Sequence, residues 1–233
     1  MENNELEQYS LPFKNSVALV PAAGLGTRLG LGPKAFLQLG GKTLLERVVT
    51  TLKPCVERIL VAVPEGYLEQ TPSLVGKDAE VYIGSDSYQA TVFKLFEQSV
   101  EDIIVIQPVV RPFITKELLC QTISKVKEHS IIAACSQPTT PVGVVESTFA
   151  TQIFSRSEVV INQVPYVFRR ATFEKLYNYA TSNQLVTQGL FEIIPMINEK
   201  IKIVPGDETN IKITTALDWE IAQKVIAPKF GWV

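Results

Sequence analysis

The sequence predicts an α/β fold built on a mostly parallel sheet, and three observations lead to this prediction. Short continuous apolar runs, such as 58–63 and 102–106, have the composition of strands that are buried on both faces. Segments of helical period, such as 89–99, lie between the runs. Gly-rich or polar loops follow several runs directly. Strands that alternate with helices pair in parallel through right-handed crossovers, and such sheets bind ligands at the carboxyl ends of their strands.

The first half of the chain follows this alternation element by element. Short runs rich in aliphatic residues predict strands at 16–20, 58–63, 80–83, 102–106 and 130–134. Amphipathic segments predict helices at 43–52, 89–99 and 115–128. Asp86 precedes the second of these helices and is expected to be its N-cap. The loops that begin at residues 21, 84 and 107 all follow strands, so we expect them to share one crevice.

The alternation breaks between residues 137 and 163. This stretch contains Pro138 and Pro141, several short β-branched runs and no helical period, which predicts an extended β arm that projects from the sheet. Helices are expected again at about 171–180 and 188–198, a short strand at 201–204 and a final helix opening at 214–218. We therefore divide the chain into an N-terminal extension, 1–15, and a single domain, 16–233.

Length, charge and cysteine usage narrow the class of protein. A chain of 233 residues can bury a single sizeable core. A formal net charge of −2 argues against a nucleic-acid surface, which needs a clustered basic face. Neither a membrane-spanning run nor a signal peptide is visible, and three scattered cysteines without C-x-x-C spacing fit a reducing compartment. We therefore expect a cytoplasmic protein that binds neither nucleic acid nor membrane.

The segment 20–37, Val-Pro-Ala-Ala-Gly-Leu-Gly-Thr-Arg-Leu-Gly-Leu-Gly-Pro-Lys-Ala-Phe-Leu, is the most informative part of the chain. Glycines allow a backbone to approach phosphate closely, and successive N–H groups form an anion-binding concavity. Arg28 and Lys34 add positive charge to this loop. The spacing of Gly24, Gly26 and Gly30 does not match the dinucleotide fingerprint, and Ala35 after the lysine excludes a P-loop. A tight strand-to-helix turn with two surface cations is the alternative interpretation.

This loop resembles the signature loop of nucleotidylyltransferases that activate sugar or polyol phosphates. From about residue 17 to 226 the chain is similar to the 2-C-methyl-D-erythritol 4-phosphate cytidylyltransferase family, whose sister group makes CDP-ribitol. The second strong match is Gly206-Asp-Glu-Thr-Asn-Ile-Lys-Ile-Thr214, which resembles the family's Gly…Asn-Ile-Lys-x-Thr segment. The resemblance implies a Rossmann-like sheet of the nucleotide-diphospho-sugar transferase type. It also implies a homodimer in which the arm, at about 137–163, is exchanged between subunits.

The resemblance further implies a reaction and a set of site residues. A polyol phosphate, 2-C-methyl-D-erythritol 4-phosphate, attacks CTP and pyrophosphate leaves, with Mg²⁺ present. Arg28 and Lys34 match the catalytic pair at the triphosphate. The nucleotide would be bound by residues of two loops, namely Ala22, Ala23, Gly24, Gly26, Ser85, Asp86 and Thr91. The acceptor would be positioned by Arg156 of the arm and by Lys212, Thr214 and Thr187.

The chain also departs from the family pattern. The family motif His-Asp-Ala-Ala-Arg-Pro reads Gln107-Pro-Val-Val-Arg-Pro112, so Pro108 stands where the family has a metal-binding Asp. The family's Asp-Thr, Thr-Pro-Gln and Thr-Asp become Pro141-Val142, Val164-Pro165-Tyr166 and Thr187-Gln188. These changes remove hydroxyl or carboxylate groups. They imply no protein metal ligand at Pro108, and Mg²⁺ held mainly by the nucleotide phosphates.

Three hypotheses follow. The first is an active cytidylyltransferase in which Mg²⁺ keeps most of its waters, as it often does. The second is a catalytically impaired relative that binds a nucleotide or partner. The third is a nucleotidyltransferase with a different acceptor or base. The sequence does not name the acceptor, because the positions that would read it, including Val142, Val164 and Gln188, are among those changed.

Overall fold

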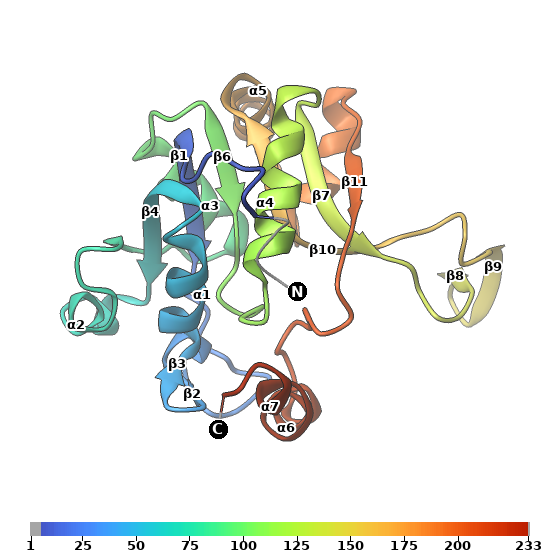
Figure 1. Cartoon of the computed structure of the whole chain (residues 1–233). Helices are drawn as coiled ribbons and strands as arrows, with labels where there is room; N and C mark the ends of the chain where they lie inside the picture. Colours follow the sequence, from blue (N-terminus) through green and yellow to red (C-terminus); the bar gives the residue numbers. More distant parts are fainter. Residues whose placement is uncertain (1–5, 233) are drawn as a thin grey trace.

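Seven strands form the central sheet of the protein, which a computed structural model describes over residues 6–232 (Figure 1). Across the sheet the order is β11-β7-β10-β6-β1-β4-β5. Their bounds are β1 Phe13–Pro21, β4 Val56–Val63, β5 Glu80–Ile83, β6 Ile103–Ile106, β7 Ile131–Ser136, β10 Ile161–Arg169 and β11 Lys202–Pro205. β10 is antiparallel to β6 and β7, whereas the other strands run parallel. The predicted mostly parallel α/β sheet is confirmed.

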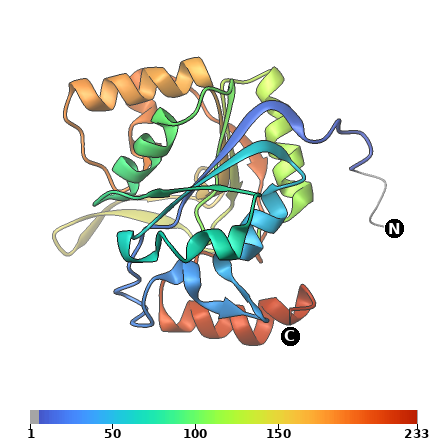
Figure 2. The same cartoon turned by 90° about the vertical axis from the view of Figure 1, so that its left-hand side faces the viewer.

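Helices cover both faces of the sheet, which Figure 2 shows nearly edge-on. One face packs against α1 (Leu44–Leu52), α4 (Lys116–Ser124) and the C-terminal turns, while the other packs against α3 (Tyr88–Glu97) and α5 (Arg170–Ser182). The centres of the five inner strands are almost fully buried because they contribute apolar side chains to both cores, whereas the edge strands β5 and β11 are more exposed. The three cysteines are buried and form no disulfide, so they pack as small apolar residues.

Most predicted elements are present, but four features differ from the sequence expectation. Ser87, not Asp86, is the N-cap of α3, because its side chain accepts the Ala90 N–H. Instead of a helix over 188–198 there are two short 3₁₀ turns, Leu190–Glu192 and Ile194–Ile197, separated by a single residue. β1 begins at Phe13, before the predicted strand start at residue 16; residues 1–5 of the predicted N-terminal extension lie outside the described residues.

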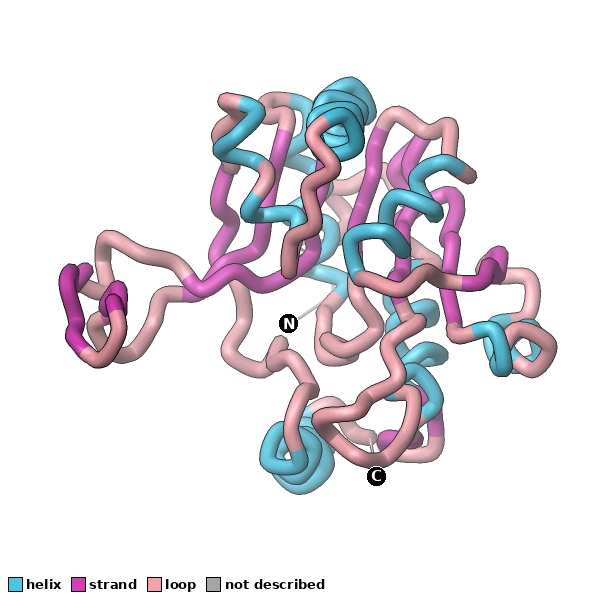
Figure 3. The backbone as a smooth tube through the Cα atoms, turned by 180° about the vertical axis from the view of Figure 1, so that it is seen from behind, coloured by secondary structure: helices cyan, strands magenta, loops and turns pink. Residues whose placement is uncertain are grey.

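The fourth difference concerns the arm. Its tip is the exposed hairpin β8 (Val142–Glu146) and β9 (Phe149–Phe154), which stands away from the body of the molecule (Figures 1 and 3). The predicted range to 163, however, overlaps β10, an antiparallel sheet strand that the sequence reading missed. Pro165 lies within β10 but between Asn162 and Tyr166, where the ladder to β7 is irregular. Its missing N–H therefore costs the sheet little.

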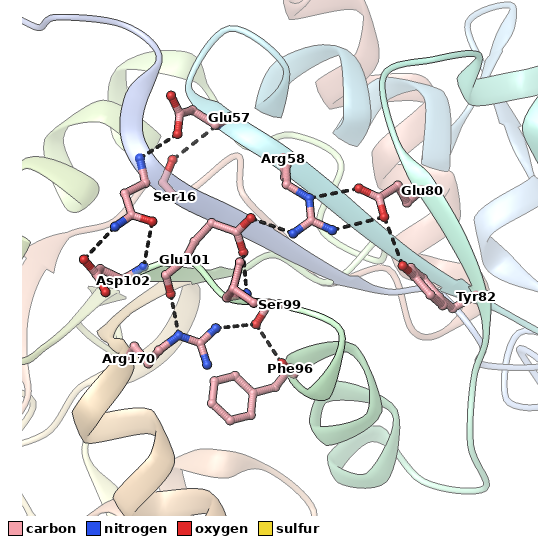
Figure 4. A network of polar contacts seen from close by, with 12 residues as sticks. Ser16, Glu57, Arg58, Glu80, Tyr82, Phe96, Ser99, Glu101, Asp102 and Arg170 are labelled. Atoms are coloured by element: carbon pink, nitrogen blue, oxygen red, sulfur yellow. Dashed lines mark hydrogen bonds and ion pairs between the residues drawn. The ribbon is translucent and has the colours of Figure 1, made fainter.

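A network of polar side chains lies at the amino ends of the parallel strands, on the side of the sheet opposite their carboxyl ends (Figure 4). Arg58 of β4 donates to Glu80 at 2.9 Å and to Glu101 at 2.6 Å. Arg170, at the start of α5, donates to the Glu101 carbonyl and to the Ser99 hydroxyl. The network fixes β4, β5, β6 and α5 to one another, so it stabilises the scaffold on the side away from the Gly-rich loop.

The remaining elements are short. β2 (Gln38–Leu39) and β3 (Lys42–Thr43) form a two-residue hairpin before α1. α2 spans Thr71–Val75, and the chain closes with α6 (Ala216–Ile221), a π turn over Ala222–Ile226 and α7 (Ala227–Lys229). Among the helices of residues 6–232, none has the length and apolar character needed to cross a bilayer.

Candidate active site

The Gly-rich loop leaves the carboxyl end of β1 as an irregular segment and returns at a 3₁₀ turn, Lys34–Phe36. Gly26 has a φ of +71°, and a β-carbon there would lie 2.1 Å from the Gly32 carbonyl oxygen. The tight closure of the loop therefore requires glycine at this position. The Ala22 N–H is bonded to the Ala62 carbonyl, whereas Gly24 is exposed, so the loop's middle lies open at the sheet edge.

Lys34 is a buried lysine, only 8% exposed. Its ammonium donates to the Ile213 carbonyl at 3.0 Å and reaches the Thr214 carbonyl at 3.4 Å. The sequence predicted both loops but not this contact, which joins them directly. Burial lowers the Lys34 pKa, and the neighbouring charge of Arg28 lowers it further.

The segment 206–214 is held against β10 and the loop after β6 by hydrogen bonds that each involve at least one main-chain atom. Gln163 exchanges hydrogen bonds with the main chain of Asp207, and the Asn210 amide donates to the Val164 carbonyl at 2.9 Å. The Ile213 N–H donates to the Val110 carbonyl. The predicted acceptor-binding segment is thus placed beside the loop that follows β6.

Four cations meet where these segments converge. The Lys212 pKa is lowered by desolvation and by the charges of Arg111 and Arg28, and Arg28 and Lys212 both lower the pKa of Lys34. Arg111 donates to the carbonyls of Asn210 and Asn162 and forms no ion pair with a carboxylate of residues 6–232. The positive charges of the neighbouring cations therefore disfavour the protonated forms of Lys34 and Lys212. A bound polyanion would offset this repulsion, so the arrangement suits a phosphate-bearing ligand.

The loop after β5 lies against the Gly-rich loop. Gly84 packs on Ala23, and the Thr91 hydroxyl of α3 bonds both the N–H and the carbonyl of Ser85, at 3.0 and 3.2 Å. Ala23, Ser85 and Thr91, predicted as nucleotide-binding residues, are therefore brought together. Asp86 is exposed on the same turn.

The end of β6 carries no carboxylate. The Gln107 side chain is buried, with its amide donating to the Arg111 carbonyl at 3.0 Å, and Pro108 follows it. Within residues 6–232 no group of three or more His, Cys, Asp or Glu side chains is arranged to hold a metal. The side chains present do not fit a metal site held by the protein.

The other predicted acceptor residues are more scattered. Thr214 contributes its main chain to the Lys34 contact. The N–H and hydroxyl of Thr187 both donate to Gln89 of α3 at 2.9 Å, which places Thr187 beside that helix. Arg156 is exposed and follows β9, in the arm that stands away from the body of the molecule (Figure 1).

Sequence reasoning missed two residues of the site. Arg111 belongs to the Arg-Pro pair that matches the family motif, so the signal was present in the sequence. Asp218, whose charge acts on Lys34, follows Thr215 at the spacing of a capping box, a pattern that predicts a helix start and not a site.

The chain is similar in sequence to known cytidylyltransferases. A family model for 2-C-methyl-D-erythritol 4-phosphate cytidylyltransferase matches residues 16–227. The enzyme of that name from Deinococcus radiodurans is 30% identical over 214 residues, covering 89% of this chain and 88% of the relative. A ribitol-5-phosphate cytidylyltransferase from Streptococcus pneumoniae is 28% identical over 227 residues, covering 88% and 96%.

Solved structures show the same fold. The crystal structure of 2-C-methyl-D-erythritol 4-phosphate cytidylyltransferase from Thermus thermophilus matches with a TM-score of 0.78 and 25% identity, covering 90% of this chain and 98% of that one. That of 4-diphosphocytidyl-2C-methyl-D-erythritol synthase from Anaerococcus prevotii matches with a TM-score of 0.80 at 20% identity, covering 89% and 94%.

Proposed function

The chain belongs to the 2-C-methyl-D-erythritol 4-phosphate cytidylyltransferase family, and we propose that it transfers CMP from CTP to 2-C-methyl-D-erythritol 4-phosphate. The observation that carries the proposal is the cation cluster of Arg28, Lys34, Arg111 and Lys212 at the carboxyl ends of the strands. This cluster suits two phosphorylated substrates. The reaction is a step of isoprenoid precursor synthesis, and we place it in the cytoplasm.

The reaction joins the two substrates at phosphorus. An oxygen of the acceptor phosphate attacks the α-phosphorus of CTP, a new P–O bond forms, and the bond to the bridging oxygen breaks to release pyrophosphate. Such a transfer needs positioning and charge neutralisation more than a protein nucleophile. Arg28 and Lys34 would neutralise the charge that builds up on the triphosphate. The main chain at Ala22, Ala23, Gly24 and Gly26 would cradle the phosphates.

The base and the acceptor would lie on either side of the triphosphate. Ser85, Asp86 and Thr91 would border the cytosine because their loop packs directly on Ala23. Lys212 would hold the acceptor phosphate, with Thr214 and Thr187 assisting.

Arg156 would act in the other subunit of a homodimer. The arm exposes apolar side chains, including Phe149 at 73% and Ile153 at 63%, which suit burial against a second copy. Exchange of the arm would carry Arg156 into the partner's site, next to the equivalent cation cluster of the partner subunit.

Mg²⁺ would enter with the nucleotide. Pro108 offers no ligand and the described side chains form no metal cage, so the ion would be held by the triphosphate and water, as magnesium commonly is. Bound in this way, it would supply charge neutralisation at the phosphates. The roles given above to Arg28, Lys34 and Lys212 do not depend on it.

Pyrophosphate release tests the proposal. The protein is incubated with CTP and Mg²⁺ alone, with 2-C-methyl-D-erythritol 4-phosphate, or with ribitol 5-phosphate. Release that requires the first acceptor supports the proposal, and release that requires only the second reassigns the acceptor. Tight CTP binding without release in any arm would identify a catalytically impaired relative.

A further inference from the structure

Two consecutive peptide groups lie between the Lys34 ammonium and the Asp218 carboxylate. In the first, the Ile213 carbonyl accepts from Lys34 at 3.0 Å while the Thr214 N–H donates to Asp218 Oδ2 at 2.9 Å. In the second, the Thr214 carbonyl lies 3.4 Å from Lys34 and the Thr215 N–H donates to the same carboxylate oxygen at 2.7 Å. Each peptide therefore presents its oxygen to the cation and its N–H to the anion.

This arrangement strengthens both sets of hydrogen bonds. A peptide group is a dipole whose negative end is the carbonyl oxygen, so a cation at one end and an anion at the other polarise it in the same sense. Hydrogen bonds to charged groups are shorter and stronger than those between neutral groups. We propose that Asp218 is a positioning residue that fixes the Lys34 ammonium for the triphosphate through these two peptides. The inference rests on the proposed role of Lys34 in nucleotide binding.

Helix capping does not account for the whole arrangement. Thr215 and Asp218 form a capping box at the start of α6, which requires the Thr215 N–H bond and the return bond from the Asp218 N–H to the Thr215 hydroxyl. The bond from the Thr214 N–H lies outside that box. It belongs to the peptide whose carbonyl makes the shorter contact with Lys34, so it links the carboxylate to the site.

The charges that face Lys34 explain why a carboxylate is needed there. Burial, Arg28 and Lys212 all lower the Lys34 pKa, in that order of effect, and Asp218 raises it. On the Asp218 side, burial alone would raise the pKa of the carboxyl, but the N–H groups of Thr215 and Thr214 and the Lys34 charge bring it below its usual value. The carboxylate thus offsets part of the repulsion that lowers the Lys34 pKa.

The test compares Asp218→Asn with Thr215→Ala and Asp218→Glu. Asp218→Asn keeps the size of the side chain and removes its charge. We expect kcat/KM near pH 8 to fall by about tenfold, which corresponds to about 1.4 kcal/mol, and the alkaline limb of its pH profile to move to lower pH. Thr215→Ala removes the cap hydroxyl but keeps the carboxylate, so it should lower the melting temperature and leave that limb in place. Asp218→Glu, a residue suited to the capping box, should recover part of the activity.

A second readout separates this inference from the proposed function. The Lys34 side-chain nitrogen is titrated by NMR in ¹⁵N-lysine protein, with the Lys34→Arg variant assigning the signal, and binding of inorganic triphosphate is measured across the same pH range. The expected result is a lower Lys34 midpoint and weaker triphosphate binding in Asp218→Asn, even if no acceptor supports turnover. Equal Lys34 midpoints in wild type, Asp218→Asn and Thr215→Ala would overturn the inference and leave Asp218 a capping residue.

Discussion

Gly84 lies directly against Ala23, so closely that a β-carbon added at Gly84 would come within 2.2 Å of the Ala23 β-carbon. The loop after β5 and the loop after β1 therefore meet at a point where only a hydrogen atom fits. Because Thr91 bonds Ser85 in the same turn, this contact sets the distance between the proposed cytosine and phosphate subsites.

Gly84→Ala is expected to separate the two loops and weaken CTP binding. Overpacking of this kind costs about 1–3 kcal/mol. Calorimetric titration with CTP measures the effect. Gly66→Ala is the matched control, since a β-carbon there meets nothing within 4 Å and should leave affinity unchanged. Equal affinity in both variants would show that the Gly84 turn does not border the nucleotide.

Lys34→Ala is expected to reduce CTP affinity or turnover by about 2–4 kcal/mol, because it removes a charge that faces the triphosphate. Lys42→Ala, an exposed lysine on β3, serves as the control. The burial that lowers the Lys34 pKa has a further consequence. The active ammonium form is lost as pH rises through this lowered pKa, so wild-type activity should decline at a lower pH than an ordinary lysine, near 10.4, would allow. An unchanged rate and affinity in Lys34→Ala would reduce the loop to a simple turn.

Pro108→Asp is expected to supply a magnesium ligand at the carboxyl end of β6. A carboxylate there would face the phosphates, and the restored backbone N–H is a small risk at a loop position. The prediction is more Mg²⁺-dependent pyrophosphate release with CTP, with only a modest gain while Val142 and Val164 offer no hydroxyl to the acceptor. Tighter Mg²⁺ binding without faster release would locate the deficit in acceptor recognition. No change in either quantity would remove Pro108 from the metal site.

The protein is expected to be a homodimer at micromolar concentration, joined through the arm. Replacing Phe149 and Ile153 together with Ser removes two exposed apolar side chains of the arm and should yield monomers, measured by light scattering. Activity should fall when the dimer is lost, because Arg156 of the partner subunit then no longer reaches the site. Val100→Ser, at a residue 79% exposed elsewhere, should leave the dimer intact. A monomeric wild type would contradict the exchange of the arm.

Glu101→Gln is expected to destabilise the fold by about 1–3 kcal/mol, because it weakens the charge-assisted hydrogen bond from Arg58 to a nearly buried side chain. Burial alone would raise the Glu101 pKa, but Arg58 and backbone N–H groups hold it below its usual value. The carboxylate therefore stabilises the fold above its unfolded pKa, and this contribution is lost as pH falls through the folded pKa. Urea unfolding should show the difference from wild type near pH 7 and its disappearance in acid. Glu80→Gln, more exposed, should cost less.

How far the sequence predicts the structure depends on the range of the interactions. Local patterns locate the sheet strands that consist of apolar runs, because a buried parallel strand has a distinctive composition. The N-cap of α3 was placed one residue early, since Asp86 and Ser87 both carry suitable side chains and packing decides between them. The helix expected over 188–198 failed because Gly189 and Pro195 shorten it to 3₁₀ turns.

The site itself was predicted as a list of residues and not as an arrangement. Arg28, Lys34 and Lys212 were identified from the two matched segments. Their convergence depends on Lys34 reaching main-chain oxygens far along the chain, a contact that no local pattern encodes. The sequence does not identify Asp218 as a site residue, because its spacing from Thr215 predicts only the start of a helix.

The bond from Lys34 to the Ile213 carbonyl spans 179 positions of sequence. The contact requires both regions of the sheet to be in place, because Lys34 follows β1 and Ile213 follows β11. An intermediate that has formed only β1, β4 and β5 has the Gly-rich loop but nothing to hold its lysine. CTP should therefore bind the completed fold alone, and at a concentration of 100 times its Kd it would add about 2.7 kcal/mol to global stability. Nucleotide binding would thus stabilise the fully folded chain relative to partly folded forms.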